Sequence, residues 1–467
     1  MTRPKNVLWI TTDHMRWDNI AACGAPWMHT PNLDRLVARG VTLRQCHNQN
    51  PLCMPSRASF MSGLYPQQTQ VTANGHTLPP DFPLTPGRLF GAGGYTTVQI
   101  GKLHFQPHED LDLDPRARHD YGFDVLCLSE ESGCYDDAYM TWLHTEHPEL
   151  VDVFRVPRPT SPERVAERSG RVLDAPWQAS HSGWVADAAD RWLAGRAARG
   201  GQFVHLGFYA PHPPLNPTRE MFEPYDGAEL PPPRIAPEEW TDKPEPLRSM
   251  LRRRADLTPE VLDQYRRHFF AMVTGVDLAV GRALTRLEAE AALDDTLIVF
   301  TADHGDMCGD HGLILKGPHF YDQVTHVPCV LHWPNGLGAA GRAVDGLAEM
   351  VDLMPTLLEL CGLPVPEAMA GRSMAAALRD GRPPEPREDV YGYHHGEIAM
   401  VRTDSHKLVR FGAAGGEVLY DVAADAPEVV NHAEDPAYGD VLDELRERLL
   451  RRTMEACRSP LRRTYRF

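Results

Sequence analysis

The sequence predicts an α/β fold, with a large, mostly parallel central sheet flanked by helices and a small C-terminal α+β subdomain. Short, nearly continuous apolar runs, such as residues 7–12 and 296–301, alternate with segments of helical periodicity. Strands without regular polar alternation are typical of parallel sheets that are covered on both faces. A hydrophobic content of 42% over 467 residues is enough for a large core and excludes a disordered chain.

The first strand, residues 7–12, is followed by a predicted helix over residues 30–40. Thr30 is placed at its N-cap, Pro31 at its first helical position, and Gly40 at its end. Further strands are expected at residues 95–100, 203–209, 296–301 and 327–333, and a long helix at 259–293. This alternation predicts βαβ units rather than a sandwich or a helical bundle.

Two segments rich in charged residues and proline, 106–174 and 213–254, interrupt this alternation and are interpreted as loop-bearing insertions that wall a site. A polar, proline-rich stretch near 376–390 then separates two predicted domains, a catalytic α/β domain over 1–380 and a subdomain over 381–467. The subdomain is expected to form antiparallel strands at 398–402, 407–411 and 417–421 and a charged final helix at about 437–457. That helix is a candidate contact in a homo-oligomer.

Charge and hydropathy exclude several classes of partner. The chain has 47 Lys and Arg against 64 Asp and Glu, a formal net charge of −17, so we expect no nucleic-acid and no anionic membrane partner. No apolar run reaches the length of about 18 residues that spans a bilayer. The N-terminus lacks a signal-peptide pattern, and the nine cysteines include no C-x-x-C pair. We therefore expect a cytoplasmic protein with reduced thiols.

Titratable residues follow four of the predicted strands. Ligands bind at the carboxyl ends of the strands in open α/β sheets, so these residues are expected to meet at one edge. They are Asp13 and His14, Lys102 and His104, His212, and Asp303 and His304. Any one of them alone could be a solvated loop charge, but four strand ends together favour a site.

The segment 50–65, NPLCMPSRASFMSGLY, is the most informative. Pro55 and Ser56 are expected to open a short helix, so Cys53 would lie just before a helix N-terminus, where negative charge is favoured. Arg57 follows four residues later, about one helical turn away. From the residues alone, Cys53 could be a buried structural thiol or a thiolate nucleophile.

The run Cys53-Met54-Pro55-Ser56-Arg57 resembles the C-x-P-S-R maturation signature of type I sulfatases, in the alkaline phosphatase superfamily. The resemblance covers nearly the whole chain. Further matching segments are residues 6–13, 30–36, 101–105, 208–214, 301–316, 327–334, 351–364 and 419–431. It implies an alkaline-phosphatase-like fold and oxidation of Cys53 to formylglycine by a formylglycine-generating enzyme.

The resemblance also implies one divalent metal held by Asp13, Cys53, Asp303 and His304. The chain departs from the commonest family pattern at His14 and His304, where an Asp and an Asn are usual, and an Asp-His pair at 303–304 resembles the choline sulfatase and phosphonate monoester hydrolase branches. His14 is a further candidate ligand or equally a residue behind the ligands. Ca²⁺ is favoured, with Mn²⁺, which imidazole suits better, and Mg²⁺ as alternatives.

The mechanism that the resemblance implies begins with a formylglycine hydrate at residue 53, activated by the metal and Arg57. Lys102 and Lys316 would stabilise the negative charge that develops on the sulfuryl oxygens, and His212 or Lys316 would protonate the leaving oxygen. His104 would act as the base that releases sulfate. Substrate binding is expected from Lys102, His212, Lys316 and Asn74.

Two residues have competing interpretations. Asn74 matches a substrate-side Asn of the two branches, but it could equally be a turn former beside Gly75. Asp277, in the long helix, is interpreted as a capping or packing residue rather than a catalytic one.

The sequence thus favours a sulfatase, arylsulfatase-like, that acts on a small anionic sulfate monoester. The alternative is a phosphonate monoester hydrolase or phosphodiesterase that uses the same site. Ser56 favours the sulfatase, because the phosphonate hydrolases carry Ala at that place. A non-catalytic binding protein and a thiol hydrolase are disfavoured, since the presumed metal carboxylates and the C-x-P-S-R context are all present.

Overall fold

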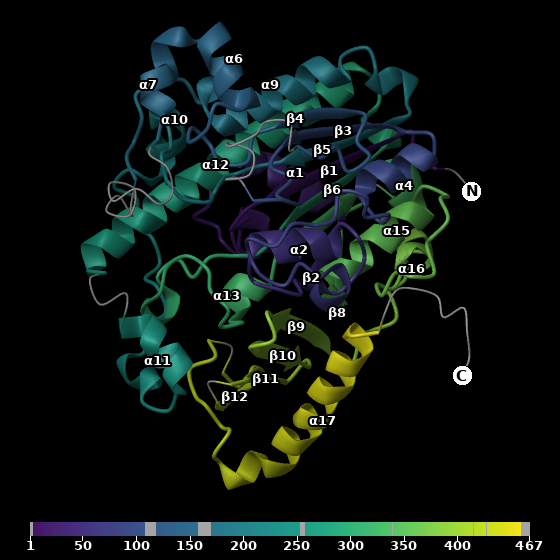
Figure 1. Ribbon diagram of the computed structural model, residues 1–467. Helices are drawn as coiled ribbons and strands as arrows, with labels where there is room; N and C mark the ends of the chain where they lie inside the picture. The colour runs from purple at the N-terminus through teal and green to yellow at the C-terminus, as the bar shows by residue number, and fades with distance from the viewer. Residues whose placement is uncertain are drawn as a thin grey trace.

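The computed structural model describes residues 3–107, 118–156, 170–252, 257–338, 340–413, 415–425 and 427–458. Its strands form two sheets, an eight-stranded main sheet and a four-stranded sheet near the C-terminus. Figure 1 shows the main sheet in the upper part of the molecule and the small sheet below it. The predicted fold class is confirmed.

The main sheet is parallel except for one strand. Its order is β4 (Val125–Leu128), β3 (Thr96–Gly101), β5 (Gln202–Gly207), β1 (Asn6–Thr12), β6 (Thr296–Ala302), β7 (Cys329–His332), β2 (Val41–His47) and β8 (Arg342–Glu349). Only β7 among them runs antiparallel to its neighbours. The fully buried strands β1, β5, β6 and β7 were all predicted from their apolar runs.

Three strands of the main sheet were not predicted, namely β2, β4 and β8. β2 and β8 carry polar residues among the apolar ones, and β4 has only four residues. β4 pairs with β3 at the edge of the sheet, so segment 106–174 is not purely an insertion but supplies a strand.

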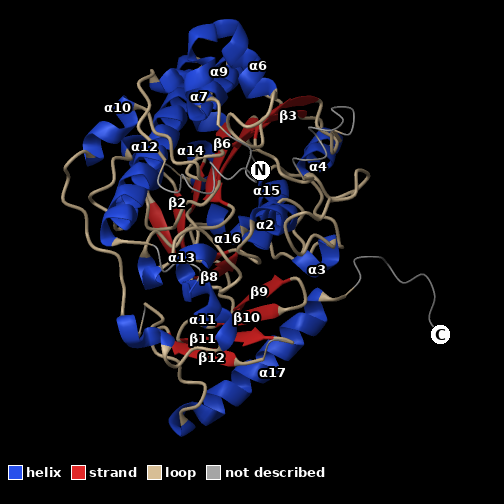
Figure 2. Ribbon diagram, turned by 60° about the vertical axis from the view of Figure 1, so that its left-hand side comes forward, coloured by secondary structure: helices blue, strands red, loops and turns tan. Residues whose placement is uncertain are grey.

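Helices cover both faces of the main sheet. The α-helices are α1 (Pro31–Arg39), α2 (Cys53–Phe60), α3 (Pro66–Thr69), α4 (Pro86–Ala92), α6 (Ala138–Glu146), α7 (Val151–Phe154), α9 (His181–Leu193), α10 (Arg219–Phe222), α11 (Glu245–Arg252), α12 (Pro259–Ala289), α13 (Asp322–Thr325), α14 (Pro334–Leu337), α15 (Leu353–Leu360), α16 (Ala375–Arg379) and α17 (Gly439–Ala456). Figures 1 and 2 place α9 and α12 on one side of the sheet and α2 and α15 on the other. On the second side, the Trp9 ring of β1 packs against Phe60 of α2 with ring centroids 5.7 Å apart. This contact fixes α2 against the central strand.

The C-terminal sheet has the order β12 (Glu417–Asp421), β11 (His406–Phe411), β10 (Ile398–Arg402) and β9 (Val390–His394), and all its pairs are antiparallel. Three of these strands and the final helix agree with the prediction, whereas β9 was not predicted. Helix α17 packs along β10 and β11 (Figure 2). The predicted boundary at 380–381 falls between β8 and β9 and stays a prediction.

A buried ionic network joins the subdomain to the main sheet. Arg452 of α17 contacts Glu349 at the end of β8 at 2.6 Å and Asp389 at 2.8 Å. Arg387 also reaches Glu349, at 2.8 Å. Because Glu349 is fully buried, its charge needs both guanidinium groups, and the network therefore fixes where α17 docks.

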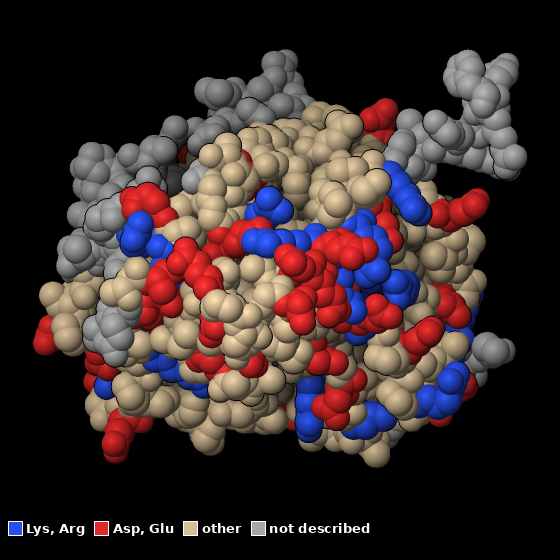
Figure 3. Space-filling view, turned by 90° about the horizontal axis from the view of Figure 1, so that it is seen from below, with Lys and Arg blue, Asp and Glu red and all other residues tan. Residues whose placement is uncertain are grey.

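Acidic and basic side chains alternate on the face shown in Figure 3, which is the lower side of the molecule in Figure 1. Ion pairs near the surface include Arg446 of α17 with Glu417 of β12 at 2.7 Å and Arg448 with Glu444 within α17 at 2.8 Å. Of the helices in the described ranges, none has the length and apolarity needed to cross a bilayer.

Asp277 of α12 caps α1, which confirms the structural interpretation of this residue. Its Oδ1 accepts the backbone N–H groups of Asn32 at 3.0 Å and Leu33 at 2.8 Å. Thr30 is at the N-cap position as predicted, but its hydroxyl accepts the N–H of Ala21 instead of a helical N–H. Burial raises the pKa of Asp277 to about 6.

We predict that Asp277→Ala lowers the free energy of unfolding by about 1–2 kcal/mol, because α1 loses its cap. Urea denaturation of the whole chain measures this change. Asp263→Ala is the matched control on the same helix, since Asp263 is half exposed and pairs with Arg267 near the surface. The control should cost at most about 0.5 kcal/mol. Equal losses in the two variants would contradict the capping role.

Candidate active site

Titratable side chains that follow four strands of the main sheet lie together at the carboxyl ends of those strands. Asp13 follows β1, Lys102 follows β3, and Asp303 follows β6, while His212 comes a few residues after β5. Parallel β1, β3, β5 and β6 are neighbours in the sheet, so their carboxyl ends lie side by side. The structure thus brings together residues that are up to about 290 positions apart in the chain.

Two buried ion pairs form the base of the site. Lys102 Nζ lies 2.7 Å from Asp13 Oδ2, and Arg57 Nε lies 2.7 Å from Asp303 Oδ2. None of these side chains is more than 1% exposed. Burial alone would raise the pKa of Asp13, but the ammonium groups of Lys102 and Lys316 outweigh it and hold that pKa well below its usual range. Asp13 is therefore an anion ready to bind a cation.

Cys53 is the first residue of α2, so the helix begins at Cys53 and not after it as predicted. Its Sγ lies 3.8 Å from Asp13 Oδ1 and 3.4 Å from His304 Nε2, and the Lys316 ammonium contacts it directly. Burial and Asp13 would raise the pKa of the thiol, but Lys316, His304 and Lys102 outweigh them and lower it.

The helix that carries Cys53 is hydrogen-bonded to the end of β6. The Ser56 hydroxyl donates to the backbone carbonyl of Asp303 at 2.6 Å, and the side-chain amide of Asn48 donates to the same carbonyl at 3.2 Å. Together with the Arg57–Asp303 pair, these bonds fix residue 53 relative to Asp303. Ser56 thus has a positioning role here, which its place in the motif did not indicate.

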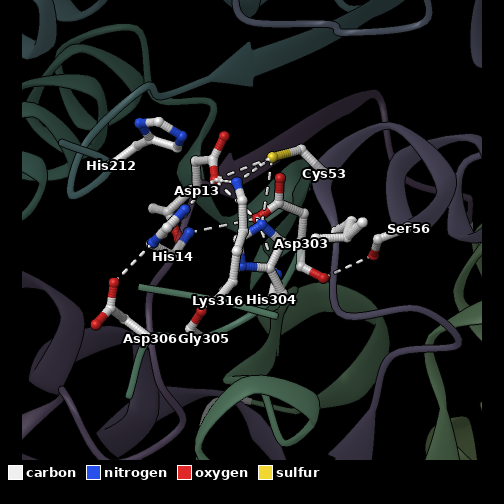
Figure 4. A network of polar contacts seen from close by, with 12 residues as sticks. Asp13, His14, Cys53, Ser56, His212, Asp303, His304, Gly305, Asp306 and Lys316 are labelled. Carbon is white, nitrogen blue, oxygen red and sulfur yellow. Dashed lines mark hydrogen bonds and ion pairs between the residues drawn. The ribbon is translucent and has the colours of Figure 1, made fainter. Parts of the chain in front are cut away.

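Four residues present ligand atoms for a cation. Asp13, Cys53, Asp303 and His304 are all buried, and their ligand atoms lie within 4.8 Å of one another. Figure 4 shows these side chains converging from the ends of β1 and β6 and the start of α2. The structure thus brings together these four of the predicted ligands, which offer two carboxylates, one imidazole and the Sγ atom of residue 53. His14 lies outside this group.

His14 faces the other side of Asp13. Its Nδ1 lies 2.8 Å from Asp306 Oδ2, and its ring lies 4.4 Å from that of His212 and 4.6 Å from that of His304 (Figure 4). Burial and the Lys316 charge lower the pKa of His14 to about 4, and the same two causes lower the pKa of His212 well below its usual range. Both imidazoles are therefore neutral near pH 7.

His104 and Lys102 share the loop after β3. His104 is buried, and its backbone N–H donates to Glu130 Oε1 at 3.0 Å. Burial raises the pKa of Glu130 despite that bond. Lys102 also lies over the ring of Tyr209, 5.0 Å from its centroid, and Tyr209 contacts His212.

Sequence reasoning missed Asp306, Glu130 and Tyr209 as parts of this site. Asp306 could have been found, because it is the second Asp of the segment Asp303-His304-Gly305-Asp306 that the motif already contained. Tyr209 likewise lies in the matching segment 208–214, close to His212, whereas Glu130 lies outside every matching segment, so no local signal marked it.

Asn74 lies at the exposed edge of the site. Its Oδ1 accepts the backbone N–H of Met54, the second residue of α2, at 3.1 Å. This bond satisfies one of the free N–H groups at the helix start, beside Cys53. Neither of the two interpretations from the sequence included this bond.

Comparison with known proteins gives concordant matches. A family model described as Sulfatase matches residues 5–363, and one described as N-sulphoglucosamine sulphohydrolase, C-terminal, matches residues 309–455. An arylsulfatase of Clostridium perfringens is 25% identical over 96% of this chain and 94% of the relative. A choline-sulfatase of Rhizobium meliloti is 28% identical over 93% of this chain and 83% of the relative. The crystal structure of the phosphonate monoester hydrolase of Agrobacterium radiobacter has a TM-score of 0.83 and 27% identity, and the match covers 97% of this chain and 96% of that one.

We predict that Asn74→Ala speeds hydrogen exchange at the Met54 amide and costs about 1 kcal/mol of stability, because the helix start loses its acceptor. Asn74→Asp keeps an acceptor and adds a negative charge that the helix dipole favours, so it should stay near the wild type. Mass-spectrometric hydrogen exchange resolves the first turn of α2. Unchanged exchange in Asn74→Ala would show that the bond has no capping role.

Proposed function

Because this chain belongs to the sulfatase family, we propose that it hydrolyses a small sulfate monoester, with the oxidised side chain of Cys53 as its nucleophile. The observation that carries the proposal is the position of residue 53. It is the first residue of α2, buried among Asp13, His304 and Lys316, and the bonds of Ser56 and Arg57 to Asp303 hold it there. The relatives of this chain include a choline-sulfatase, and its structural neighbours include a phosphonate monoester hydrolase. These are the two branches that the sequence indicated.

A divalent cation fits the residues present. Asp13, Asp303 and His304, together with residue 53, would hold it, because all four are buried and their ligand atoms lie within 4.8 Å of one another. Such an ion supplies Lewis-acid stabilisation to the sulfuryl oxygens and lowers the pKa of a bound hydroxyl. We propose Ca²⁺ as the ion, with Mn²⁺ or Mg²⁺ as alternatives, because two carboxylates favour a hard cation and the imidazole favours a softer one.

Oxidation of Cys53 to formylglycine is the second required feature, and it needs a formylglycine-generating enzyme as a maturation partner. The hydrated aldehyde would supply a hydroxyl as nucleophile and a second hydroxyl for release of sulfate. A thiol at this position has neither. The segment from Cys53 to Arg57 retains the C-x-P-S-R pattern that this maturation reads.

The surrounding side chains would bind the sulfuryl oxygens and transfer protons. Lys316 contacts residue 53 and lies 4.0 Å from Asp13, so it can bind an equatorial sulfuryl oxygen next to the nucleophile, as Lys102 can from the other side of Asp13. Arg57 is committed to Asp303 and orients that carboxylate. His212 is half-buried at the mouth of the site, where it or Lys316 can protonate the leaving oxygen, and His104 is the proposed base for sulfate release.

The second candidate function keeps this site and changes the reacting group to a phosphonate monoester or phosphodiester. The structural similarity to the phosphonate monoester hydrolase of Agrobacterium radiobacter favours it. Ser56 favours the sulfatase. Its hydroxyl donates a hydrogen bond to the Asp303 carbonyl and so positions the start of α2, which an Ala side chain could not do.

We predict that the mature protein carries an aldehyde at residue 53. Peptide mass spectrometry should find residue 53 lighter than cysteine, and a hydrazide probe should label the protein there. Co-expression with a formylglycine-generating enzyme should raise the labelled fraction and the turnover together. Cys53→Ala, the control, should lose both the label and the turnover. Full turnover in Cys53→Ala would contradict the proposal.

We predict that kcat/KM for an aryl sulfate exceeds that for an aryl phenylphosphonate under the same conditions. Steady-state assays on one mature preparation, with the same aryl leaving group in both esters, measure the ratio. Ser56→Ala should lower both values by loosening residue 53, while it leaves the order of the two unchanged. A higher kcat/KM for the phosphonate ester would select the second candidate function.

A further inference from the structure

A second group of side chains with the geometry to hold a metal ion lies beside the first. Asp13, His14 and His212 present ligand atoms that lie within 4.8 Å of one another, and neither histidine belongs to the group that contains Asp303 and His304. The two groups share only Asp13. His14 is fully buried, and its Nε2 makes no hydrogen bond in the structure.

The hydrogen bonds of Asp306 fix which nitrogen of His14 can bind a cation. Asp306 accepts the Tyr265 hydroxyl at 2.8 Å and the backbone N–H groups of Cys308 and Leu315 at 2.8 and 3.1 Å. It is therefore an acceptor, and His14 Nδ1, at 2.8 Å from it, must carry the proton. The lone pair is left on His14 Nε2, 3.7 Å from Asp13 Oδ1.

The same reasoning applies to His212. Its Nδ1 lies 2.6 Å from the backbone carbonyl of Pro213, which can only accept, so Nδ1 carries the proton and Nε2 the lone pair. The His14 and His212 rings meet edge to face with centroids 4.4 Å apart, as Figure 4 shows beside Asp13. A histidine whose other ring nitrogen donates to a carboxylate or carbonyl is the usual form of a metal-binding histidine.

We propose that Asp13, His14 and His212 bind a second divalent ion of the zinc class, separate from the ion held by Asp303 and His304. Two imidazoles and one carboxylate suit Zn²⁺ better than Ca²⁺ or Mg²⁺, which prefer oxygen ligands. Zn–N bonds of about 2.0–2.1 Å require the three side chains to close on the ion by small movements. The site needs no oxidation of Cys53, so it stands independently of the proposed function.

Nearby charges set the order in which the two groups fill. The Lys102 ammonium lies 2.7 Å from Asp13 Oδ2, and the Lys316 ammonium 4.0 Å from Asp13 Oδ1. Both repel a further cation, and only Asp13 among the three ligands carries a negative charge. The second ion therefore binds more weakly than the first. By occupying His212 Nε2, the ion keeps that nitrogen from taking up the proton that it would pass to the leaving oxygen, so the ion inhibits turnover.

Zinc binding to the full-length protein tests the proposal directly. Equilibrium dialysis against Zn²⁺, with the metal content measured by mass spectrometry, gives the ions bound per chain and their affinities. His14→Gln and His212→Gln should each bind one ion fewer than the wild type, and the lost ion should be a weak one. Asp303→Asn should lose the tight ion instead.

Two further variants make the result specific. Asp306→Asn keeps every ligand but weakens the partner of His14, so the weak site should lose about 10- to 100-fold in affinity. His76→Gln lies outside the group, beside Thr72 and His395, and should bind as many ions as the wild type. The Zn²⁺ concentration that halves turnover should rise at least tenfold in Asp306→Asn. Zinc content and affinity that are the same in His14→Gln, His212→Gln and the wild type would overturn the proposal.

Discussion

Burial of two carboxylates at the centre of the molecule is the constraint on which the rest of the structure depends. Asp13 and Asp303 are both 0% exposed, and an unpaired buried charge costs several kcal/mol. Each is therefore matched by a buried cation, Lys102 for Asp13 and Arg57 for Asp303. Removing either partner of such a pair typically costs about 3–5 kcal/mol, so stability and the shape of the site are maintained by the same contacts.

This constraint explains where residue 53 lies. Arg57 pairs with the Asp303 carboxylate, and Ser56 donates a hydrogen bond to the Asp303 carbonyl. The first turn of α2 therefore packs against the end of β6. Trp9 and Phe60 hold the other end of the helix on β1. Residue 53 is then fixed beside Asp13, His304 and Lys316, a position suited to a nucleophile that works next to a cation.

Much of the fold and the site could be predicted from the sequence, because the apolar runs of β1, β5 and β6 are unambiguous and the residues that follow them carry the charges. The same local reasoning could not find β4, which is short, or β2 and β8, which carry polar residues. It could not assign a role to Asp306 or Glu130 either. Asp306 acts on His14 across 292 positions of sequence, and Glu130 holds the backbone of the loop that carries Lys102 and His104. Such contacts depend on the packing of distant segments and leave no local pattern.

The central claim is that a cation and an oxidised residue 53 share the pocket between Asp13, Asp303 and His304. A crystal structure of the mature, active protein, with anomalous scattering to identify the ion, tests it most directly. The account predicts one tightly bound ion in contact with Asp13, Asp303 and His304 and with oxygen, in place of sulfur, on the side chain of residue 53. An intact sulfur at residue 53 in fully active protein, or an ion that avoids these three ligands, would contradict it.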